Sequence, residues 1–436
     1  MLEELASETY SGRSAWQDGD IRAARYIIDC LRLIPDLVPM GTDGTDEVAA
    51  YPPYKSVVKP YGLGRWENQD RVGDYQPWLQ NFVYPMNVMR GDMRLVVDGQ
   101  ELMPTVDYTA KEFSPSCHGE YRVVHVPDSL VADSTLVDYL NSGVLHDAFA
   151  VIDFGTYKTL PAHPYERYLP YIGKLDPEKI GGIILKDHEL FPYFKARSYY
   201  QTPVPVLNVT GNFPADARKL KLDLDAELIP QKDAHNVIAY LPGIDEQQKE
   251  YVCFIAHYDH LGLMGRDNLF PGANDNASGA AMLYALASYF SQHRPTCGVQ
   301  FIWLDAEEEN LLGAFYYCAN PTLNLKNIRM LINLDMVADN GDHLATECSE
   351  QGLKELEKIK EINSHNGSYP PLNIVLQELS DGSDHYPFAE EGIPAVYFST
   401  EGDFLQHYHT PRDGVNLISH DNFDRLFQLI TTYVMQ

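Results

Sequence analysis

The sequence predicts an α/β protein in which a mixed, mostly parallel sheet is flanked by helices, with a β-rich domain inserted into it. Three observations lead to this prediction. From residue 233 onward, strand-like and helix-like segments alternate, which indicates a sheet covered by helices on both faces. Residues 84–232 instead contain short alternating strands with turn residues between them. Acidic residues and histidines follow several strands of the later part, where α/β sheets place their sites.

Length and charge limit the class of protein. The chain has 436 residues, which is enough for two domains that each bury a core. It carries 33 Lys and Arg against 62 Asp and Glu, a net charge of −29. This negative charge repels nucleic acid and anionic membranes, so we expect neither as a partner. No run approaches the roughly 18–20 apolar residues of a membrane span, and the oligomeric state is not predicted.

The first 232 residues divide into two parts. Residues 1–83 are expected to be the N-terminal part of the catalytic domain, with a helix at 21–33 that has a regular apolar stripe. A Pro-, Gly- and Asp-rich stretch from about 40 to 80 is predicted to be an irregular connection. Residues 84–232 are the predicted insert, with strands at 93–97, 121–126, 148–154, 181–185 and 204–209.

Residues 233–436 are predicted to form the rest of the catalytic domain. Its expected strands are 251–256, 298–304, 329–335, 372–377 and 394–399. Its expected helices are 276–291, 310–319, 351–364, 384–391 and 420–434. Because candidate ligands follow the strands ending at 256, 304 and 335, we expect the site at the carboxyl edge of this sheet.

The first candidate signature is His257-Tyr258-Asp259-His260, which follows the predicted buried strand 251–256. Residues two apart on a strand face the same side. His257 can therefore bind a metal while Asp259 accepts its other ring N–H, the arrangement that fixes a metal-ligating imidazole. A His–Asp pair at the surface fits equally well, since H-x-D often occurs by chance.

The second signature is the glycine-bounded loop Pro271-Gly272-Ala273-Asn274-Asp275-Asn276-Ala277-Ser278-Gly279, which opens an Ala- and Leu-rich helix. An Asp at such a place is usually an N-cap. The carboxylate of Asp275 has two oxygens, however, and could instead bridge two cations. Both interpretations stay open at this point.

A run of acids, Asp305-Ala306-Glu307-Glu308-Glu309, follows the predicted strand 298–304. These acids could form the first turn of the next helix, where negative charge is favourable. Alternatively, since Glu307 and Glu308 cannot point the same way, one can bind a metal and the other can act as a general base.

Two further candidates follow in the chain. Asp335 ends the hydrophobic strand 329–335, where an unpaired charge would be costly, and metal binding explains why it is tolerated. His409 precedes a Pro-marked turn in Tyr408-His409-Thr410-Pro411-Arg412-Asp413. Asp413 is near enough in sequence to be the partner that orients this histidine.

Taken in order, H-Y-D, G-A-N-D-N-A-S-G, A-E-E, N-L-D-M and Y-H-T-P-x-D resemble the di-zinc aminopeptidase family typified by bacterial leucyl aminopeptidase. Glutamate carboxypeptidase II, the catalytically dead transferrin receptor and glutaminyl cyclase are its relatives. The resemblance covers most of residues 234–436 and touches Leu5-Ala6-Ser7 and Gly12-Arg13. It implies a zinc-exopeptidase-like fold, and the position of residues 84–232 is similar to that of a protease-associated domain.

The same resemblance implies two Zn²⁺ per chain and a role for each candidate. His257 and Asp335 would hold one zinc, Glu308 and His409 the other, and Asp275 would bridge them. Glu307 would be the general base and Asp259 would orient His257. The stretch Ser383-Asp384-His385 is similar to one lining the site in relatives, so contacts to the ligands or to substrate are expected there.

Two places depart from the family pattern. Residues 309–314 stand where relatives often carry Gly and then Gly-Ser, and Ser380 lies near where some members place a tyrosine that stabilises the transition state. The metal ligands are unaffected by these departures. The group that would stabilise the oxyanion is left unassigned.

The predicted function is a zinc exopeptidase, an aminopeptidase that removes N-terminal residues from peptides. The alternatives are a single-zinc acyltransferase like glutaminyl cyclase, a carboxypeptidase of the same family, and a non-catalytic binding protein like the transferrin receptor. The binding protein is disfavoured because all five ligands and the base are present. A serine hydrolase would need a G-x-S-x-G elbow, which the sequence lacks.

The expected location is outside the cytoplasm, although a cytoplasmic protein fits the sequence as well. Met1-Leu2-Glu3-Glu4-Leu5 does not resemble a signal peptide, which starts basic and continues apolar. Because the family resemblance begins within the first dozen residues, we expect a secreted or periplasmic protein whose leader was removed from this sequence. The six cysteines show no CxxC spacing, and Cys253 in a predicted core strand is expected to be a buried thiol.

Overall fold

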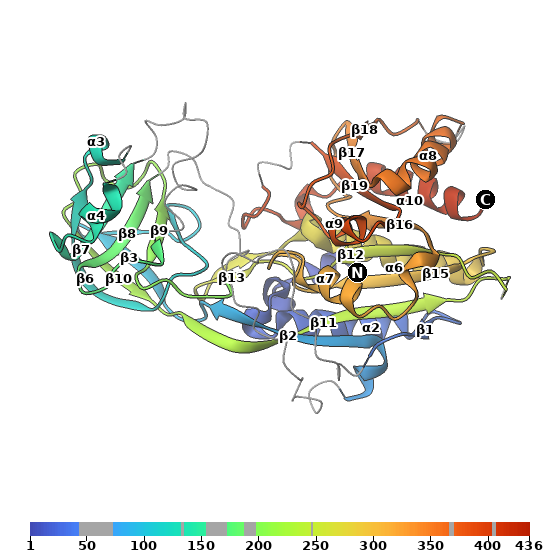
Figure 1. Cartoon of the computed structure of the whole chain (residues 1–436), viewed down its shortest axis with the longest axis horizontal. Coiled ribbons are helices and arrows are strands. Elements are labelled where there is room, and N and C mark those ends of the chain that lie inside the picture. The colour runs from blue at the N-terminus through green and yellow to red at the C-terminus, as the bar shows by residue number, and fades with distance from the viewer. Residues whose placement is uncertain are drawn as a thin grey trace. The chain divides into compact units, whose positions relative to one another are not determined.

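The computed structural model describes residues 1–42, 73–131, 135–153, 172–186, 198–245, 247–365, 370–402 and 407–436. The chain forms two compact units (Figure 1). One comprises Met1–Tyr84, Gln231–Gly262 and Phe270–Gln436, and the other comprises Pro85–Pro230 and Leu263–Leu269. The predicted division into domains at residues 84 and 232 stays a prediction, as does the likeness of the insert to a protease-associated domain. Most of the predicted irregular connection lies outside the described residues.

The larger unit is built on a mixed sheet. Among the described residues this sheet has nine strands in the order β1-β11-β15-β12-β16-β19-β17-β18, and β2 also pairs with β11. The four central strands β15, β12, β16 and β19 are parallel, whereas β11 and β17 beside them are antiparallel. The bounds are β1 Val38–Pro39, β2 Leu79–Val88, β11 Glu227–Leu241, β12 Tyr251–His257, β15 Gly298–Leu304, β16 Ile328–Leu334, β17 His343–Cys348, β18 Ile374–Leu376 and β19 Ala395–Glu401.

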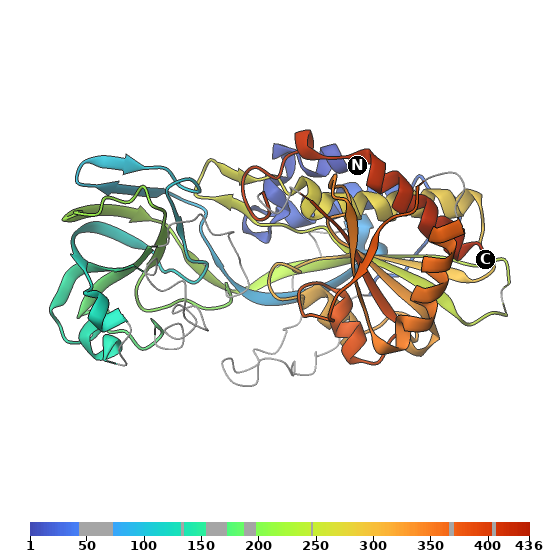
Figure 2. The same cartoon turned by 90° about the horizontal axis from the view of Figure 1, so that it is seen from above.

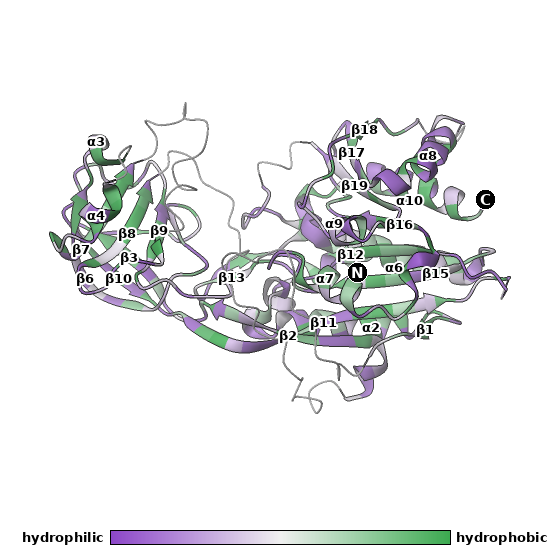
Figure 3. Ribbon diagram, viewed as in Figure 1, coloured by the Kyte–Doolittle hydropathy of each residue, from purple (hydrophilic) through white to green (hydrophobic). Residues whose placement is uncertain are grey.

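Helices cover both faces of this sheet (Figure 2). Along β12, Val252 and Phe254 pack in one core with α2 Gly19–Leu31, α6 Gly279–Gln292, α8 Leu353–His365 and α10 His420–Val434. Cys253 and Ile255 point the other way, into a second core with α7 Leu312–Ala319 and α9 His385–Glu390. Strands β12 and β15 are buried along their whole length and are mostly apolar (Figure 3), as is expected of strands covered on both faces. The predicted fold class is therefore confirmed.

The smaller unit has its own sheet of eight described strands in the order β4-β3-β10-β6-β7-β8-β9-β5. Its strands are β3 Met93–Val97, β4 Gln100–Leu102, β5 Tyr108–Ala110, β6 Cys117–His125, β7 Leu145–Asp153, β8 Ile180–Lys186, β9 Val206–Val209 and β10 Lys219–Leu224. The short helices α3 Asp128–Val131 and α4 Leu136–Leu140 pack on it. The last residue of the predicted strand 148–154 lies outside the described residues.

Other short elements include a helix and a two-stranded sheet. The helix α1 Leu2–Leu5 opens the described chain, and β13 Gly262–Met264 pairs with β14 Asn268–Phe270. None of the helices in the described residues combines the length and apolar character that crossing a bilayer requires.

Among the predicted helices that begin later than expected, two follow the loops of the candidate site. The helix predicted from 276 begins at Gly279, because Asp275 and Asn276 have non-helical backbone angles. The helix predicted from 310 begins at Leu312, because Asn310 and Leu311 are left-handed, with φ of 68° and 59°. The acidic run 305–309 is therefore not the first turn of a helix, so the helix dipole does not account for it.

Candidate metal centre

The parallel strands bring the candidate residues to one edge of the sheet. His257 is the last residue of β12, Asp335 directly follows β16, and Glu307 and Glu308 lie in the turn after β15. Since these three strands are neighbours and parallel, their carboxyl ends meet. Asp275 reaches the same place from the loop before α6.

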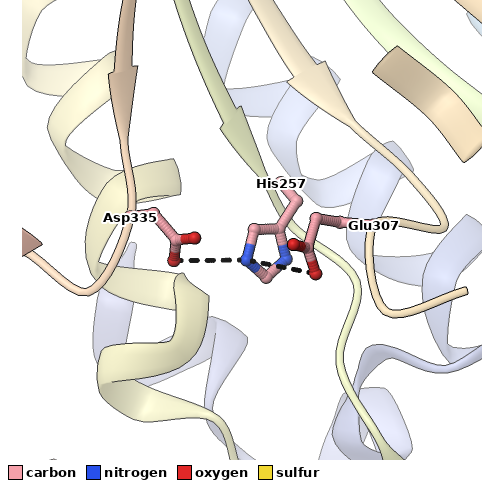
Figure 4. A group of neighbouring side chains, drawn as sticks. All are labelled: His257, Glu307 and Asp335. Atoms are coloured by element: carbon pink, nitrogen blue, oxygen red, sulfur yellow. Dashed lines mark hydrogen bonds and ion pairs between the residues drawn. The ribbon is translucent and has the colours of Figure 1, made fainter. Parts of the chain in front are cut away.

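His257 lies among three carboxylates and is almost completely buried, with 1% of its surface exposed. Its Nε2 is 3.3 Å from Asp335 Oδ1, 3.4 Å from Asp275 Oδ1 and 3.9 Å from Glu307 Oε2. Figure 4 shows the ring between Asp335 and Glu307. Burial alone would lower the pKa of His257, but Glu307 and Asp335 outweigh burial and raise this pKa well above its usual value.

His409 faces the other side of Asp275. Its Nε2 is 3.1 Å from Asp275 Oδ2 and 3.2 Å from Glu308 Oε2. The two oxygens of Asp275 therefore face two different histidines, Oδ1 toward His257 and Oδ2 toward His409. An N-cap role is excluded for Asp275, because Ser278 occupies the N-cap position of α6.

The donor atoms fit divalent metal ions. Two ligands bound at about 2.0–2.1 Å to one tetrahedral zinc lie about 3.3 Å apart, and the four nitrogen–oxygen distances between each histidine and its two nearest carboxylates are 3.1–3.4 Å. Imidazole and carboxylate are ligands that zinc accepts. Within the described residues, two groups bring three such ligand atoms close together, His257 with Glu307 and Asp335, and His260 with Asp275 and Glu308.

Charge also favours a cation here. Burial on its own would raise the pKa of Asp275, but His260, His257 and His409 hold it well below its usual range. Buried carboxylates outnumber histidines, since six acids gather around three imidazoles: Asp259, Asp275, Glu307, Glu308, Asp335 and Asp384. Buried charges need partners, and bound cations would supply them.

Adjacent Glu307 and Glu308 point to different places. Glu308 accepts from His260 Nδ1 at 2.7 Å and faces His409, with 3% of its side chain exposed. Glu307 faces His257 and is more accessible, at 12%. Burial raises the pKa of Glu308 to about 7 and that of Glu307 well above its usual value.

His260 was not assigned a role from the sequence, yet the structure places it in the centre. Its ring is fully buried, and its Nδ1 lies 2.7 Å from Glu308 Oε1 and 3.7 Å from Asp275 Oδ2. Strand alternation could not indicate this, because β12 ends at His257 and His260 belongs to the loop. The available signal was a second histidine three residues after a candidate ligand.

Asp259 contacts two parts of the site, the ring of His257 and the turn after β15. Its Oδ1 is 3.6 Å from His257 Nδ1, longer than a hydrogen bond, while its backbone carbonyl is at 3.3 Å from that nitrogen. The carboxylate accepts the backbone N–H groups of Glu307 at 3.1 Å and Glu308 at 3.3 Å. Asp259 therefore fixes where both glutamates stand.

The stretch Ser383-Asp384-His385 lies against the ligands. Ser383 Oγ donates to Asp335 Oδ2 at 2.7 Å, and His385 Nε2 lies 3.1 Å from Glu347 Oε2. The Asp384 carboxyl is fully buried, and neither of its oxygens has a hydrogen-bond partner among the described residues. Burial raises its pKa well above the usual value.

The remaining candidates are also placed. Asp413 accepts the backbone N–H groups of Asn274 at 2.8 Å and Asp275 at 3.0 Å, so it supports the Asp275 loop. Ser380 bonds to Glu347 through its N–H at 2.6 Å and its hydroxyl at 2.8 Å. Tyr408 stacks on His409 with ring centroids 3.8 Å apart, and burial raises the pKa of its phenol, which therefore stays protonated.

Comparison with known proteins supports the resemblance found in the motifs. Residues 236–434 match the sequence model of peptidase family M28. The chain is 27% identical over 246 residues to aminopeptidase YwaD of Bacillus subtilis, covering 53% of this chain and 51% of that protein. It is 30% identical over 165 residues to aminopeptidase Y of Saccharomyces cerevisiae, covering 35% and 31% respectively. The chain thus spans about half the length, or less, of these curated relatives.

Solved structures share the fold over most of the chain. An aminopeptidase from Aneurinibacillus sp. strain AM-1 superposes with a TM-score of 0.62 at 19% identity, covering 99% of this chain and 92% of that one. The zinc aminopeptidase BSAP from Bacillus subtilis gives 0.59 at 20% identity, covering 82% and 84%. At these identities the likeness concerns the fold, and together with the family match it confirms the predicted family resemblance.

Proposed function

Since residues 236–434 match peptidase family M28, we propose that this protein is a zinc-dependent aminopeptidase with two zinc ions per chain. The observation that carries the proposal is the position of Asp275, whose two oxygens face His257 and His409 separately. A carboxylate in this position can serve two ions at once. With a single ion, one of the two histidines would lie beside carboxylates without a metal ion between them.

The chain would hold the ions with two sets of donors. His257, Asp335 and Oδ1 of Asp275 form the first set, and His409, Glu308 and Oδ2 of Asp275 form the second. Bound zinc supplies a Lewis acid that polarises a carbonyl and lowers the pKa of water. Ser383 donates a hydrogen bond to Asp335 and holds that carboxylate in place. Asp259 accepts the backbone N–H of Glu307 and so holds the turn that carries Glu307 and Glu308.

Glu307 is the proposed general base. It is more accessible than Glu308, faces the His257 side of the centre, and has a pKa raised by burial. A base with a raised pKa holds a proton more firmly once it has taken it, which suits a group that must carry that proton. Glu307 would take a proton from the attacking water and deliver it to the leaving amine.

The phenol of Tyr408 is the proposed partner of the developing oxyanion. It lies against His409, and its raised pKa keeps the O–H donor in place at neutral pH. Ser380, which stands near the tyrosine position of some family members, has both its N–H and its hydroxyl committed to Glu347. The proposed substrate is a peptide with a free N-terminus, since an ammonium group suits a centre rich in buried carboxylates.

The proposal is tested with two peptides that differ only in N-terminal acetylation. Acetylation removes the amine's charge and its ability to bind metal, so the free peptide should lose residues stepwise from its N-terminus while the acetylated one stays intact. Hydrolysis of both peptides at equal rates, or internal cleavage, would contradict an aminopeptidase. The cyclase and carboxypeptidase alternatives are not favoured by the comparisons, which name aminopeptidases. A secreted or periplasmic location stays a proposal, to be tested by cell fractionation.

A further inference from the structure

Arg13 is a buried cation that bonds to the backbone of residues in the proposed metal centre. None of its surface is exposed, although it lies in the irregular segment before α2. Ser11, Gly12 and Arg13 have φ of 48°, 64° and 50°. Left-handed backbone is unfavourable for residues with a Cβ atom, and persists only where the surrounding structure requires it. The segment therefore adopts a costly conformation, and in it the guanidinium is directed inward.

All five N–H groups of this guanidinium donate to backbone carbonyls. They connect three segments of the chain, which contain Leu5, Tyr258 and Gly272. Nε donates to Tyr258 O at 2.7 Å, Nη1 to Leu5 O at 2.9 Å and Pro271 O at 2.6 Å, and Nη2 to Gly272 O at 2.7 Å and Asp275 O at 3.2 Å. Since an arginine has five donors, its hydrogen-bonding capacity is fully used in holding backbone.

Two of these segments carry proposed ligands. Tyr258 lies between His257 and Asp259, and Asp275 is the proposed bridge. The backbone N–H of His260 also donates to the carbonyl of Arg13, at 3.3 Å. The same arginine thus holds the exit of β12 and the loop before α6 at fixed positions relative to each other.

Asp413 holds the opposite side of the Asp275 loop. It accepts the N–H groups of Asn274 and Asp275, whereas Arg13 binds the carbonyl of Asp275. The peptide groups on both sides of the bridging residue are therefore fixed, one by the Asp413 carboxyl group and one by the Arg13 guanidinium. Burial lowers the pKa of Arg13 to about 10, and the attraction of Asp413 and Asp275 opposes this, so the guanidinium stays charged at neutral pH.

Glycines keep this contact close. Gly12 has no room for a Cβ, which would meet the carbonyl oxygens of Gly262 and Phe270. A Cβ on Gly272 would meet the guanidinium of Arg13 and the carbonyl of Asp275. The backbone is therefore packed directly against the arginine, with no side chain between them.

We propose that Arg13 is a positioning residue that holds the two ligand-bearing loops in metal-binding geometry before any ion is bound. The inference rests on the proposed metal centre, but it concerns how the chain prepares that centre. Preorganised ligands bind more tightly because the ordering is already complete when the ion arrives. Loss of residues that orient metal ligands lowers metal affinity by about 10–100-fold.

The first test needs no variant. Amide hydrogen exchange is measured on the metal-free protein at the N–H groups of His260, Asn274 and Asp275, which are bonded to Arg13 and Asp413. Arg13 is fixed in the folded chain, so these amides should already be protected without zinc. Rapid exchange that becomes slow only after zinc is added would show that the metal orders the loops, and would overturn the proposal.

The second test compares Arg13→Lys with Arg425→Lys. Arg425 is the matched control, because it also donates to backbone carbonyls, those of Pro370 and Pro371, but lies on α10 and contacts neither ligand-bearing loop in the bonds described. Zinc affinity, measured by competition with a chelator, should fall about 10–100-fold in Arg13→Lys and stay within about twofold in Arg425→Lys. Exchange at Asp275 should accelerate only in the first variant.

The outcomes are separable from the proposed function. Equal zinc affinity in folded Arg13→Lys and wild type would mean that Arg13 only stabilises the fold, which overturns the proposal. If Arg13→Lys does not fold, exchange in the metal-free wild type still shows whether the two loops are ordered before an ion is bound, and rapid exchange there overturns the proposal. A wild type that binds zinc but removes no N-terminal residue would contradict the aminopeptidase while leaving the effect of Arg13 on affinity measurable. A wild type that binds no zinc would overturn both.

Discussion

At the scale of single residues, the site depends on which carboxylate oxygen faces which histidine. Asp259 uses its two oxygens to hold the turn of Glu307 and Glu308, and that turn sends the two glutamates in different directions. Glu308 joins His409 and His260, whereas Glu307 remains beside His257 with more of its side chain accessible. The different positions of two adjacent acids lead directly to different expected roles.

We predict that Glu307→Gln retains both zinc ions while kcat falls by about 10²–10⁴-fold, the usual contribution of a general base. The amide keeps the shape of the side chain but cannot accept the proton. Glu308→Ala should instead lose zinc, because it removes a ligand. Zinc content and kcat on an aminoacyl chromogenic substrate are measured for both variants. If Glu307→Gln emptied the site and Glu308→Ala left it full, the two assignments would be exchanged.

We also predict that His260→Gln weakens zinc binding, by about 10–100-fold if the ring only orients Glu308, because its Nδ1 bonds to that carboxylate. His293→Gln is the control, since His293 is exposed and stacks on Tyr289 away from the centre. Zinc affinity is measured by chelator competition. An unchanged affinity in His260→Gln would mean that Glu308 needs no orienting partner.

Some of these residues can be predicted from the sequence and others cannot. His257, Asp275, Glu308, Asp335 and His409 were selected because each stands at a strand end or in a distinctive loop, and the structure brings all five together. His260 was missed because strand periodicity stops at His257. Asp413 was selected as a partner for His409, but its carboxylate bonds to the Asp275 loop, a contact across 138 residues that spacing could not indicate.

At the scale of elements, the loop 380–385 takes its position from β17. Glu347 on that strand accepts the N–H and hydroxyl of Ser380 and lies 3.1 Å from His385 Nε2. The loop in turn places Ser383 against Asp335. Burial would raise the pKa of Glu347, but the hydrogen bonds from His385 and Ser380 outweigh burial and lower it below the usual value.

We therefore predict that Glu347→Gln costs about 1.5–3 kcal/mol of unfolding free energy at pH 6, the range for hydrogen bonds to a charged group. A carboxylate with a lowered folded pKa stabilises the fold above its unfolded pKa, about 4.3 for Glu, and this stabilisation is lost as pH falls through the folded pKa. The difference between variant and wild type should shrink from pH 6 to pH 3. Denaturant unfolding checks this, and a difference that grew on acidification would contradict the pKa assignment.

Elements with clear periodicity were predicted well, and the irregular starts were not. The strand at 298–304 and the helix at 420–434 were predicted with the observed bounds, because both are continuous periodic runs. The helices after the two ligand loops start late, since Asp275, Asn310 and Leu311 leave helical geometry. β17 was missed because His343–Cys348 is short and mixes polar with apolar residues, and its pairing with β19 is antiparallel within a mostly parallel sheet.

At the scale of the whole molecule, every proposed ligand and the proposed base lie in the larger unit. The smaller unit has its own sheet and its own apolar core. Changes confined to it should therefore leave the chemistry intact. His188 lies in the same sequence region but outside the described residues. His125 is therefore the better residue with which to test whether the smaller unit affects the chemistry.

We predict that His125→Ala changes kcat on a small aminoacyl substrate by less than about twofold, a difference well under 1 kcal/mol in the barrier. His125 is exposed on β6, and its ring contacts only the backbone carbonyl of Ala217 in the contacts described. KM for long peptides is measured alongside, because access could change there without the chemistry changing. A hundredfold loss in kcat with folding and zinc content intact would mean that this unit contributes catalytic groups.

The number of zinc ions held per chain tests the central claim most directly, because the claim is that Asp275 serves two ions with its two oxygens. Metal-free wild type and Asp275→Asn are dialysed to equilibrium against buffered zinc, and bound zinc is counted per chain. Wild type should bind two ions, and both should weaken together in Asp275→Asn, since one neutral amide cannot replace a shared anion. A wild type that binds only one ion, or a variant that loses one ion and holds the other as tightly as before, would contradict the bridging carboxylate.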